Sequence, residues 1–302
     1  MTTSDVLRTP DERFEGLADW PYAPRYLSCR GLRVHYVDEG DGPIVLLVHG
    51  EPDWGYMYRH TIARLVQAGY RCIAADHIGF GRSDKVRQDG WYVIERHVEV
   101  LRHVIETLDL RDAMLVVHDW GGPIGLRQAI DMPERFSRIA ILNTWLHHDG
   151  FVYGEGIRRW REFAGRFEPG TGDLPCGEIM LRTYGTACAD PDAVRRAYEA
   201  PFPGPEWKAG PRRFPWCLPF AQPVEGNAAD QARCFAALSS WARGPVHLIW
   251  GGADPIFTLD WAEAWAARIP GATLDVIEGA SHFVAEERGA EVAERLLARM
   301  RG

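Results

Sequence analysis

The sequence lacks any apolar run long enough to cross a bilayer. Its longest uninterrupted aliphatic runs, such as Ile44–Val48, have the length of a strand, whereas a membrane-spanning helix needs roughly 20 apolar residues. The N-terminus also lacks a charged segment followed by an apolar one, which is the pattern of an export signal. We therefore expect no membrane segment and no export.

An excess of basic residues is also missing. The 34 Lys and Arg residues against 42 Asp and Glu residues give a formal net charge of −8, which argues against nucleic acid or an anionic membrane as a partner. The six cysteines are scattered, and no pair has the close spacing of a metal or redox site. We therefore expect reduced thiols in a cytoplasmic protein, with no metal and no cofactor.

Tryptophan, by contrast, is abundant, with 12 residues in a chain of 302. An indole N–H group is a hydrogen-bond donor without an acceptor, so it can bind an anion without carrying a charge. With 46% hydrophobic and 25% charged residues, the composition is that of a globular protein. The length allows two domains or one enlarged α/β unit.

Short apolar runs alternate with amphipathic stretches along most of the chain. Two of these stretches, Tyr58–Ala68 and Ile94–Leu108, carry apolar residues near helical spacing. The alternation predicts an α/β fold with a mostly parallel sheet of eight strands and helices on both faces. The predicted strands are residues 26–29, 32–37, 44–49, 72–76, 114–118, 139–143, 246–250 and 274–277.

Residues 145–223 break this alternation. They contain no convincing buried strand, and Pro- and Gly-rich pieces such as Pro201–Pro205 separate helix-like stretches. Since unstructured loops of that size are uncommon, we predict a helical cap of residues 145–223 inserted into one core domain of residues 1–144 and 224–302. Ligands of open α/β sheets bind beyond the carboxyl ends of the strands, where such a cap would lie.

Three polar side chains directly follow predicted strands. Asp119 lies in Val116-Val-His-Asp-Trp-Gly-Gly122, at the nucleophile position of the strand–turn–helix elbow Gly-x-Ser-x-Gly. Asp254 and His282 follow two later strands. Each has a simpler interpretation, as a helix N-cap, a turn former and an ordinary buried or surface histidine, respectively. The order nucleophile, acid, histidine is nevertheless that of α/β-hydrolase triads.

The chain resembles the haloalkane dehalogenase family of α/β-hydrolases over nearly its whole length, and it is most similar to the first subfamily. The resemblance rests on five motifs, of which the first two are shared with epoxide hydrolases. They are His49-Gly-Glu-Pro-Asp-Trp54, Asp76-His-Ile-Gly-Phe-Gly-Arg-Ser-Asp84, His118-Asp-Trp-Gly-Gly122, Gly252-Ala-Asp254 and Ala280-Ser-His-Phe283. Glu51, and Trp120 directly after the aspartate, are the more specific features. Asp53 and His77 depart from the family pattern by adding charge or polarity near the motifs.

The resemblance implies that Asp119 is the nucleophile, His282 the base and Asp254 the acid that orients the base. In the second subfamily a carboxylate follows the sixth strand. Here that strand ends Ile141-Leu-Asn-Thr-Trp145, without a carboxylate, which supports the first subfamily.

The resemblance also implies two sets of anion donors. The backbone N–H groups of Glu51 and Trp120 would form an oxyanion hole, and the indoles of Trp120 and Trp160 would bind the halide. Three further tryptophans are rivals of Trp160 for the second halide position, although each is better explained by packing: Trp145, Trp207 and Trp216.

The implied reaction converts a haloalkane and water into a primary alcohol, a halide ion and a proton through an alkyl ester of Asp119. A saturated carbon offers no carbonyl group to attack, so its halide must be displaced in line by an ionised nucleophile. A carboxylate is already ionised at neutral pH. The expected partners are therefore a small halogenated alkane, water and halide, while the oligomeric state stays open.

Two other functions remain open at this point. An epoxide hydrolase would use the same three residues and would need tyrosines that donate to the epoxide oxygen, for which Tyr153, Tyr184 and Tyr198 are available. A non-catalytic small-molecule receptor on the same fold would need only the pocket. An ester hydrolase is disfavoured because no serine occupies the elbow.

Overall fold

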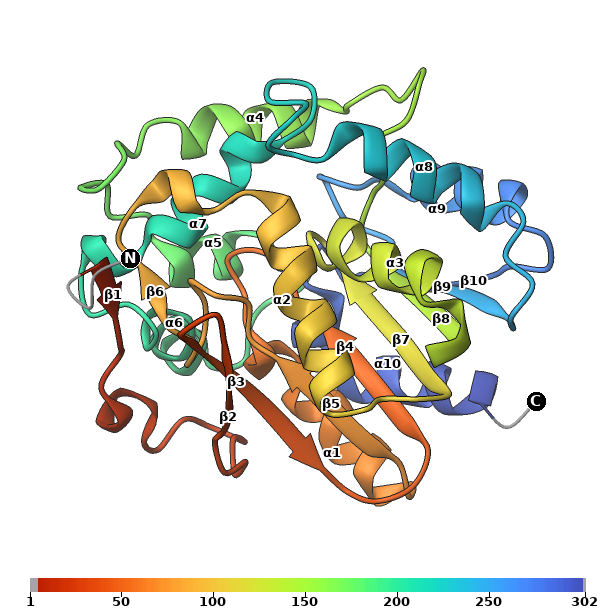
Figure 1. Ribbon diagram of the computed structural model, residues 1–302, viewed down its shortest axis with the longest axis horizontal. Coiled ribbons are helices and arrows are strands. Elements are labelled where there is room, and N and C mark those ends of the chain that lie inside the picture. The colour runs from red at the N-terminus through yellow and green to blue at the C-terminus, as the bar shows by residue number, and fades with distance from the viewer. Residues whose placement is uncertain (1–4, 301–302) are drawn as a thin grey trace.

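The structure, a computed structural model, describes residues 5–300 and centres on an eight-stranded sheet (Figure 1). The strand order is β10-β9-β8-β7-β4-β5-β3-β2. The strands from β10 to β5 pair in parallel, and β3 and β2 extend the sheet in antiparallel pairing. The strands are β2 (Arg25–Cys29), β3 (Leu32–Glu39), β4 (Ile44–Val48), β5 (Arg71–Ala75), β7 (Ala113–His118), β8 (Phe136–Leu142), β9 (Val246–Gly251) and β10 (Thr273–Ile277). Each overlaps a predicted strand, so the mostly parallel sheet of eight strands is confirmed.

The central strands are apolar because they are covered on both faces. Every residue of β7 and of β9 is buried, and so are four of the five residues of β4. Parallel strands in such a position appear in sequence as continuous apolar runs. A separate two-stranded sheet joins β1 (Val6–Leu7) to β6 (Lys85–Val86), and strands this short leave no periodic pattern to predict.

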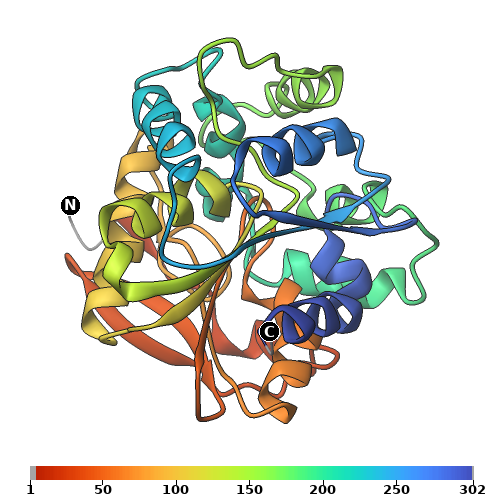
Figure 2. The same ribbon diagram turned by 90° about the vertical axis from the view of Figure 1, so that its right-hand side faces the viewer.

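Helices cover both faces of the sheet (Figure 2). On one face α1 (Arg59–Gln67) packs against α10 (Val284–Met300). On the other, α2 (Ile94–Thr107) packs against α3 (Gly121–Asp131), and α3 against α8 (Ala228–Leu238). A further helix, α9 (Leu259–Arg268), contacts β9 and β10. The two helices predicted from amphipathic spacing correspond to α1 and α2.

Between Trp145 and Pro223 the described chain forms helices and turns and no strand. The helices are α4 (Glu155–Ala164), α5 (Cys176–Arg182), α6 (Pro191–Glu199) and α7 (Ala209–Arg213). In Figure 1, α4 and α7 lie beyond the end of the sheet to which the β7 arrow points. This is the carboxyl edge, where Asp119 follows β7.

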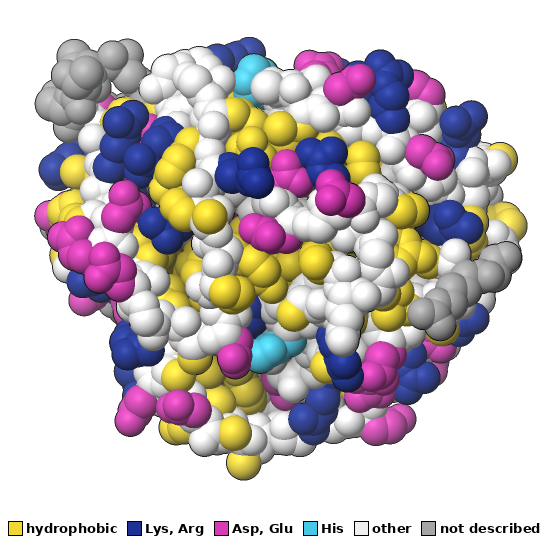
Figure 3. All heavy atoms as spheres, turned by 90° about the horizontal axis from the view of Figure 1, so that it is seen from below, with side chains coloured by type: hydrophobic (Ala, Val, Ile, Leu, Met, Phe, Trp, Pro, Cys, Tyr) yellow, Lys and Arg dark blue, Asp and Glu magenta, His cyan; other side chains and the backbone are white. Residues whose placement is uncertain are grey.

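The surface carries charges of both signs close together. On the face shown in Figure 3, basic and acidic side chains are interspersed. Some form exposed ion pairs, such as Arg30 with Glu99, whose side chains are 75% and 40% exposed. Within residues 5–300, every helix is too short or too polar to cross a membrane.

One buried carboxylate links three parts of the fold. Glu286 of α10 forms a bidentate ion pair with Arg59 of α1, with N–O distances of 2.5 and 2.8 Å. The hydroxyl groups of Tyr184 and Tyr198 also donate to this carboxylate, at 3.0 and 2.6 Å. Both tyrosines lie between α5 and the end of α6, so Glu286 connects that helical segment to two core helices.

We predict that Glu286→Ala destabilises the protein by about 3 to 5 kcal/mol, because it leaves the Arg59 guanidinium buried without its counter-charge. Urea unfolding measures the change in free energy. The matched control is Glu99→Ala in the exposed pair with Arg30, which should cost less than about 1 kcal/mol. Equal effects of the two substitutions would contradict the linking role of Glu286.

Candidate active site

The turn between β7 and α3 presents the Asp119 side chain at the carboxyl edge of the sheet. Asp119 has a left-handed backbone conformation, with φ of 49°, and is only 6% exposed. The backbone of this turn lies very close to the end of β4, since a Cβ atom on Gly121 would lie 2.3 Å from the carbonyl oxygen of Val48. A non-glycine residue pays conformational free energy for this backbone geometry. The strained strand–turn–helix arrangement is that of a nucleophile elbow.

Hydrogen bonds fix both the backbone and the carboxylate of Asp119. Its N–H donates to the carbonyl oxygen of Asn143 at 3.0 Å. Its own carbonyl oxygen accepts from the Gly122 N–H at 2.8 Å and from the Thr144 hydroxyl at 2.5 Å. In the side chain, Oδ1 accepts from the backbone N–H of Glu51 at 2.9 Å. The carboxylate is therefore held through one oxygen, and Oδ2 stays available.

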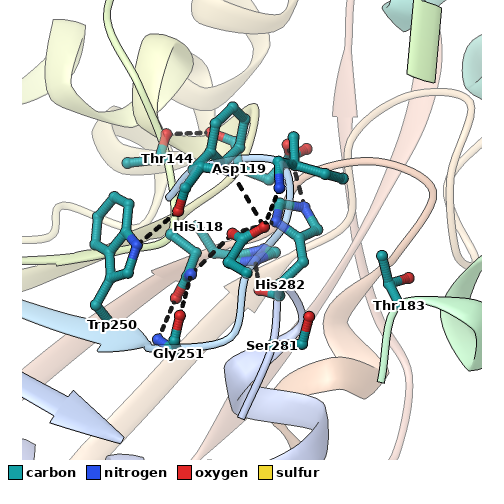
Figure 4. A network of polar contacts seen from close by, with 12 residues as sticks. His118, Asp119, Thr144, Thr183, Trp250, Gly251, Ser281 and His282 are labelled. Carbon is teal, nitrogen blue, oxygen red and sulfur yellow. Dashed lines mark hydrogen bonds and ion pairs between the residues drawn. The ribbon is translucent and has the colours of Figure 1, made fainter. Parts of the chain in front are cut away.

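His282 approaches Asp119 from another strand end (Figure 4), and Asp254 in turn contacts His282. His282, in the loop after β10, places Nε2 3.6 Å from Asp119 Oδ2. Its other ring nitrogen, Nδ1, lies 2.9 Å from Oδ2 of Asp254, in the loop after β9. His282 is 2% exposed and Asp254 4%. The side chains predicted from three distant segments thus form one contiguous chain of polar contacts.

Asn143, which directly follows β8, connects Asp254 to the sheet and was not predicted to do so. Its amide nitrogen donates to Asp254 Oδ2 at 2.8 Å, and its amide oxygen accepts from the Gly251 N–H at 2.8 Å. The other oxygen of Asp254 accepts from the backbone N–H groups of Ile256 and Phe257, at 2.7 and 3.1 Å. The only sequence signal was a polar residue at a strand end, which has many structural roles.

Charges around His282 control its protonation. Burial disfavours the imidazolium, but the carboxylates of Asp254 and Asp119 outweigh burial and raise the pKa of His282 to about 10. For the Glu51 side chain, burial and then the neighbouring carboxylates of Asp119 and Asp53 raise the pKa well above its usual range. At neutral pH, His282 is therefore cationic beside Asp119, while the surroundings of the Glu51 carboxyl favour its uncharged form.

A cavity opens onto Asp119 and His282. Apolar side chains dominate its wall. They come from the core and from residues 145–223, and they include Phe257, Phe283, Ile157, Ile179 and Leu218. A wall of this kind excludes water from the carboxylate and suits an apolar ligand.

Three of the 12 tryptophans line this cavity. Trp120, directly after Asp119, is 2% exposed, and Trp160 projects from α4. Trp145 is the third, with its ring centroid 4.7 Å from that of Trp120 in an edge-to-face arrangement. Its N–H is buried and makes no hydrogen bond with any residue from 5 to 300. The two remaining rivals do not line the cavity: Trp207 and Trp216.

The tyrosines that an epoxide hydrolase would need are directed elsewhere. Neither Tyr153 nor Tyr184 nor Tyr198 lines the cavity. Tyr184 and Tyr198 donate to Glu286, as described above. The Tyr153 hydroxyl lies 3.1 Å from Nδ1 of His147.

Comparisons with known proteins agree with this architecture. The family model of the alpha/beta hydrolase fold matches residues 43–171. A haloalkane dehalogenase of Mycolicibacterium paratuberculosis is 41% identical, with 97% of each chain covered. Haloalkane dehalogenase 1 of Mycobacterium bovis is 42% identical, covering 97% of this chain and 98% of the relative. Among solved structures, haloalkane dehalogenase DpaA from Paraglaciecola agarilytica superimposes with a TM-score of 0.89 at 36% identity, covering 97% of this chain and 98% of that one.

We predict that Asp254→Asn lowers the pKa of His282 below about 10, because Asp254 makes the largest contribution that raises it. The imidazolium should then lose its proton at a lower pH than in the parent protein. NMR titration of the His282 ring measures this, and the exposed Asp260→Asn serves as the control. An unchanged titration in Asp254→Asn would contradict the assigned electrostatics.

Proposed function

The chain belongs to the haloalkane dehalogenase family, and on that premise we propose that Asp119 is its nucleophile, His282 its base and Asp254 the acid that orients the base. The enzyme hydrolyses the carbon–halogen bond of a haloalkane. We propose that it does so through a covalent alkyl-aspartate and yields a primary alcohol. The observation that carries this proposal is the carboxylate of Asp119, held between the Glu51 N–H and His282 at the wall of an apolar cavity.

In the first step, Oδ2 of Asp119 attacks the carbon that bears the halogen, and the carbon–halogen bond breaks as the ester bond forms. Oδ2 is the reacting atom because Oδ1 already accepts the Glu51 N–H. The leaving halide needs donors in a dry pocket. Indole N–H groups donate to an anion without adding a second positive charge beside Asp119, which already faces His282. Trp120 and Trp160 supply these donors, and both line the cavity.

In the second step, His282 takes a proton from water, whose oxygen attacks the ester carbonyl carbon of Asp119. The negative charge that develops on Oδ1 is received by the backbone N–H groups of Glu51 and Trp120. Trp120 stands at the N-terminus of α3, where backbone N–H groups have no intrahelical partner. Collapse of the intermediate releases the alkoxide, which takes the proton from His282 and leaves as the alcohol. The Asp119 carboxyl that remains then gives up the proton of its new hydroxyl group, which is the proton of the overall reaction, and the carboxylate is restored.

The ester itself prepares His282 for this second role. In the free enzyme the charge of Asp119 is one of the two that raise the pKa of His282. Once Asp119 is alkylated, that charge is gone, so the pKa of His282 falls and the neutral base becomes more populated. Alkylation thus favours the protonation state that hydrolysis requires.

Residues 145–223 form the proposed cap, and residues 1–144 and 224–302 the core domain. The cavity supports this division, because the catalytic side chains come from the core, whereas much of the apolar wall comes from the intervening segment, including Ile157 and Leu218. The side chains of this segment would then determine which haloalkanes fit.

We further propose a cytoplasmic location and small-molecule partners alone: haloalkane, water and halide. All six cysteines are free, and five of them are buried, as is usual for proteins of a reducing compartment. The formal net charge of −8 likewise supports a small-molecule enzyme over a nucleic-acid-binding protein.

A panel of chloro-, bromo- and iodoalkanes tests the function, with halide release as the readout and diol formation from epoxides measured in parallel. We expect halide release without comparable diol formation, since no candidate epoxide-binding tyrosine lines the cavity. Diol formation with no halide release would identify an epoxide hydrolase instead.

We predict that Asp119→Ala abolishes turnover and that His282→Phe stops the reaction after the first step. The His282 variant should accumulate one alkyl group on Asp119, detectable as added mass of the intact protein and of the peptide that contains Asp119. The parent enzyme, sampled at steady state, is the control. An inactive His282→Phe variant that forms no adduct with a good substrate would refute the two-step mechanism.

We predict that Trp120→Phe weakens halide binding by roughly 10- to 100-fold, the effect of losing a hydrogen bond to a charged group. Quenching of protein fluorescence by bromide measures the dissociation constant. Trp207→Phe is the matched control, because its N–H lacks a partner within residues 5–300 and its side chain does not line the cavity. Trp160→Phe and Trp145→Phe then identify the second donor, and a loss in Trp145→Phe alone would overturn the assignment of Trp160.

A further inference from the structure

Asp53 and His118 lie behind the nucleophile and have no part in the steps above. His118 is the last residue of β7 and directly precedes Asp119. The side chains of Asp53 and His118 are fully buried, and Oδ2 of Asp53 lies 3.5 Å from Nδ1 of His118. Neither atom makes a hydrogen bond with any residue from 5 to 300. A buried carboxylate without a hydrogen bond is costly, so this pair needs a physical explanation.

The second ring nitrogen of His118 contacts the backbone of the base. Nε2 lies 2.8 Å from the carbonyl oxygen of His282, and Figure 4 shows the two histidines close together. A carbonyl oxygen only accepts hydrogen bonds, so Nε2 must carry a proton. Nδ1 would then repel the carboxylate of Asp53 if it presented a lone pair. One proton must therefore lie between Nδ1 of His118 and Oδ2 of Asp53.

His49, on the other side of Asp53, cannot supply that charge. Its Nε2 accepts from the backbone N–H of His77 at 2.9 Å, so this nitrogen is unprotonated. Its Nδ1 lies 2.9 Å from the carbonyl oxygen of Gly50 and 3.6 Å from Oδ1 of Asp53. His49 is therefore neutral, and His118 is the cationic partner of Asp53.

The surroundings favour an ion pair of Asp53 with His118. Burial by itself raises the pKa of Asp53, but the charged His118 ring outweighs burial and, together with the nearby Nδ1–H of neutral His49, holds that pKa below its usual range. The other titratable groups that act on Asp53 are buried as well, and burial shifts the pKa of each towards its uncharged form. They are Glu51, Tyr58 and His77.

We propose that Asp53 and His118 are a positioning pair for hydrolysis, in which Asp53 orients the His118 ring so that its N–H holds the backbone of His282. Other contacts anchor the neighbours of His282, such as the hydrogen bond from the Ser281 N–H to Glu287 at 2.9 Å. The Nε2–H group of His118 holds the backbone carbonyl of His282 itself. The inference rests on the proposed role of His282 as the base.

Such a pair affects the two chemical steps unequally. Formation of the ester needs the Asp119 carboxylate and the halide donors, but no base. Hydrolysis needs His282 Nε2 directed at a water molecule beside the ester, and a small displacement of a catalytic group costs rate steeply. Loss of the pair should therefore slow hydrolysis more than alkylation.

The test compares Asp53→Leu with Asp53→Asn, since Asp53 contacts neither substrate nor nucleophile. Leucine has a similar branched shape but no polar atom, so the His118 ring loses its orienting partner. Asparagine keeps an N–H donor for Nδ1 of a neutral His118. Rapid-quench measurements give the alkylation rate from the burst of halide and the hydrolysis rate from the decay of the alkyl-enzyme.

We expect Asp53→Leu to slow hydrolysis about tenfold or more, as removing the orienting partner of a functional histidine commonly does, with alkylation changed less than about threefold. Asp53→Asn should keep a ratio of the two rates within about threefold of the parent. The proposal would be overturned if Asp53→Leu kept the parental ratio of hydrolysis rate to alkylation rate. It would also be overturned if hydrolysis slowed equally in Asp53→Leu and Asp53→Asn. If Asp53→Leu does not fold, His118→Leu replaces it, and an unchanged ratio there also overturns the proposal.

Two controls separate this result from other failures. Asp76→Asn removes another buried carboxylate paired with a histidine, His35 at 2.7 Å, and should change the two rates alike. A selective loss of hydrolysis in Asp76→Asn would contradict the proposal. The His282→Phe variant reports on the proposed function alone: if it traps no adduct the catalytic assignment fails, whatever the Asp53 variants do.

Discussion

A carboxylate that must stay ionised at the wall of an apolar cavity is the constraint on which this structure depends. An unpaired charge in such a place is costly. Asp119 meets that cost through the Glu51 N–H on one oxygen and the cationic ring of His282 near the other. His282 in turn keeps its proton because Asp254 faces it, and Asn143 ties Asp254 to the sheet. Each of these groups forms a hydrogen bond or an ion pair with the next, and the last of them, Asn143, bonds to the backbone of β9.

The residues of this arrangement that lie just after buried strands could be predicted from the sequence. Asp119, Asp254 and His282 each follow an apolar run, and parallel strands bring such positions to one edge. Asn143 could not be chosen in this way, because an amide at a strand end has no distinctive pattern. Trp145 was named only as a rival of Trp160, because packing explains most tryptophans and only the shape of the cavity shows which ones face it.

Two departures from the family pattern illustrate the same limit. Asp53 and His77 stood out in the sequence as added charge and polarity. What they do depends on which nitrogen atoms of His49 and His118 carry a proton, and only the hydrogen bonds of the folded structure show that. The His77 N–H fixes His49 as neutral, and the His282 carbonyl fixes a proton on His118. Residues 49–53, 118 and 282 are far apart in the chain, so no local pattern could have joined them. The helices of residues 145–223 are still harder to predict from the sequence, because they are short and are joined by irregular turns.

We propose that Asp119 itself becomes part of the intermediate, and a single turnover in H₂¹⁸O can detect this. With enzyme in excess over a good bromoalkane, water attacks the ester carbonyl, so the new oxygen enters Asp119 and the alcohol keeps an unlabelled oxygen from the enzyme. We expect unlabelled alcohol and a labelled peptide that contains Asp119. Labelled alcohol from the first turnover, with Asp119 unlabelled, would mean that water displaces the halide directly and that no alkyl-aspartate forms.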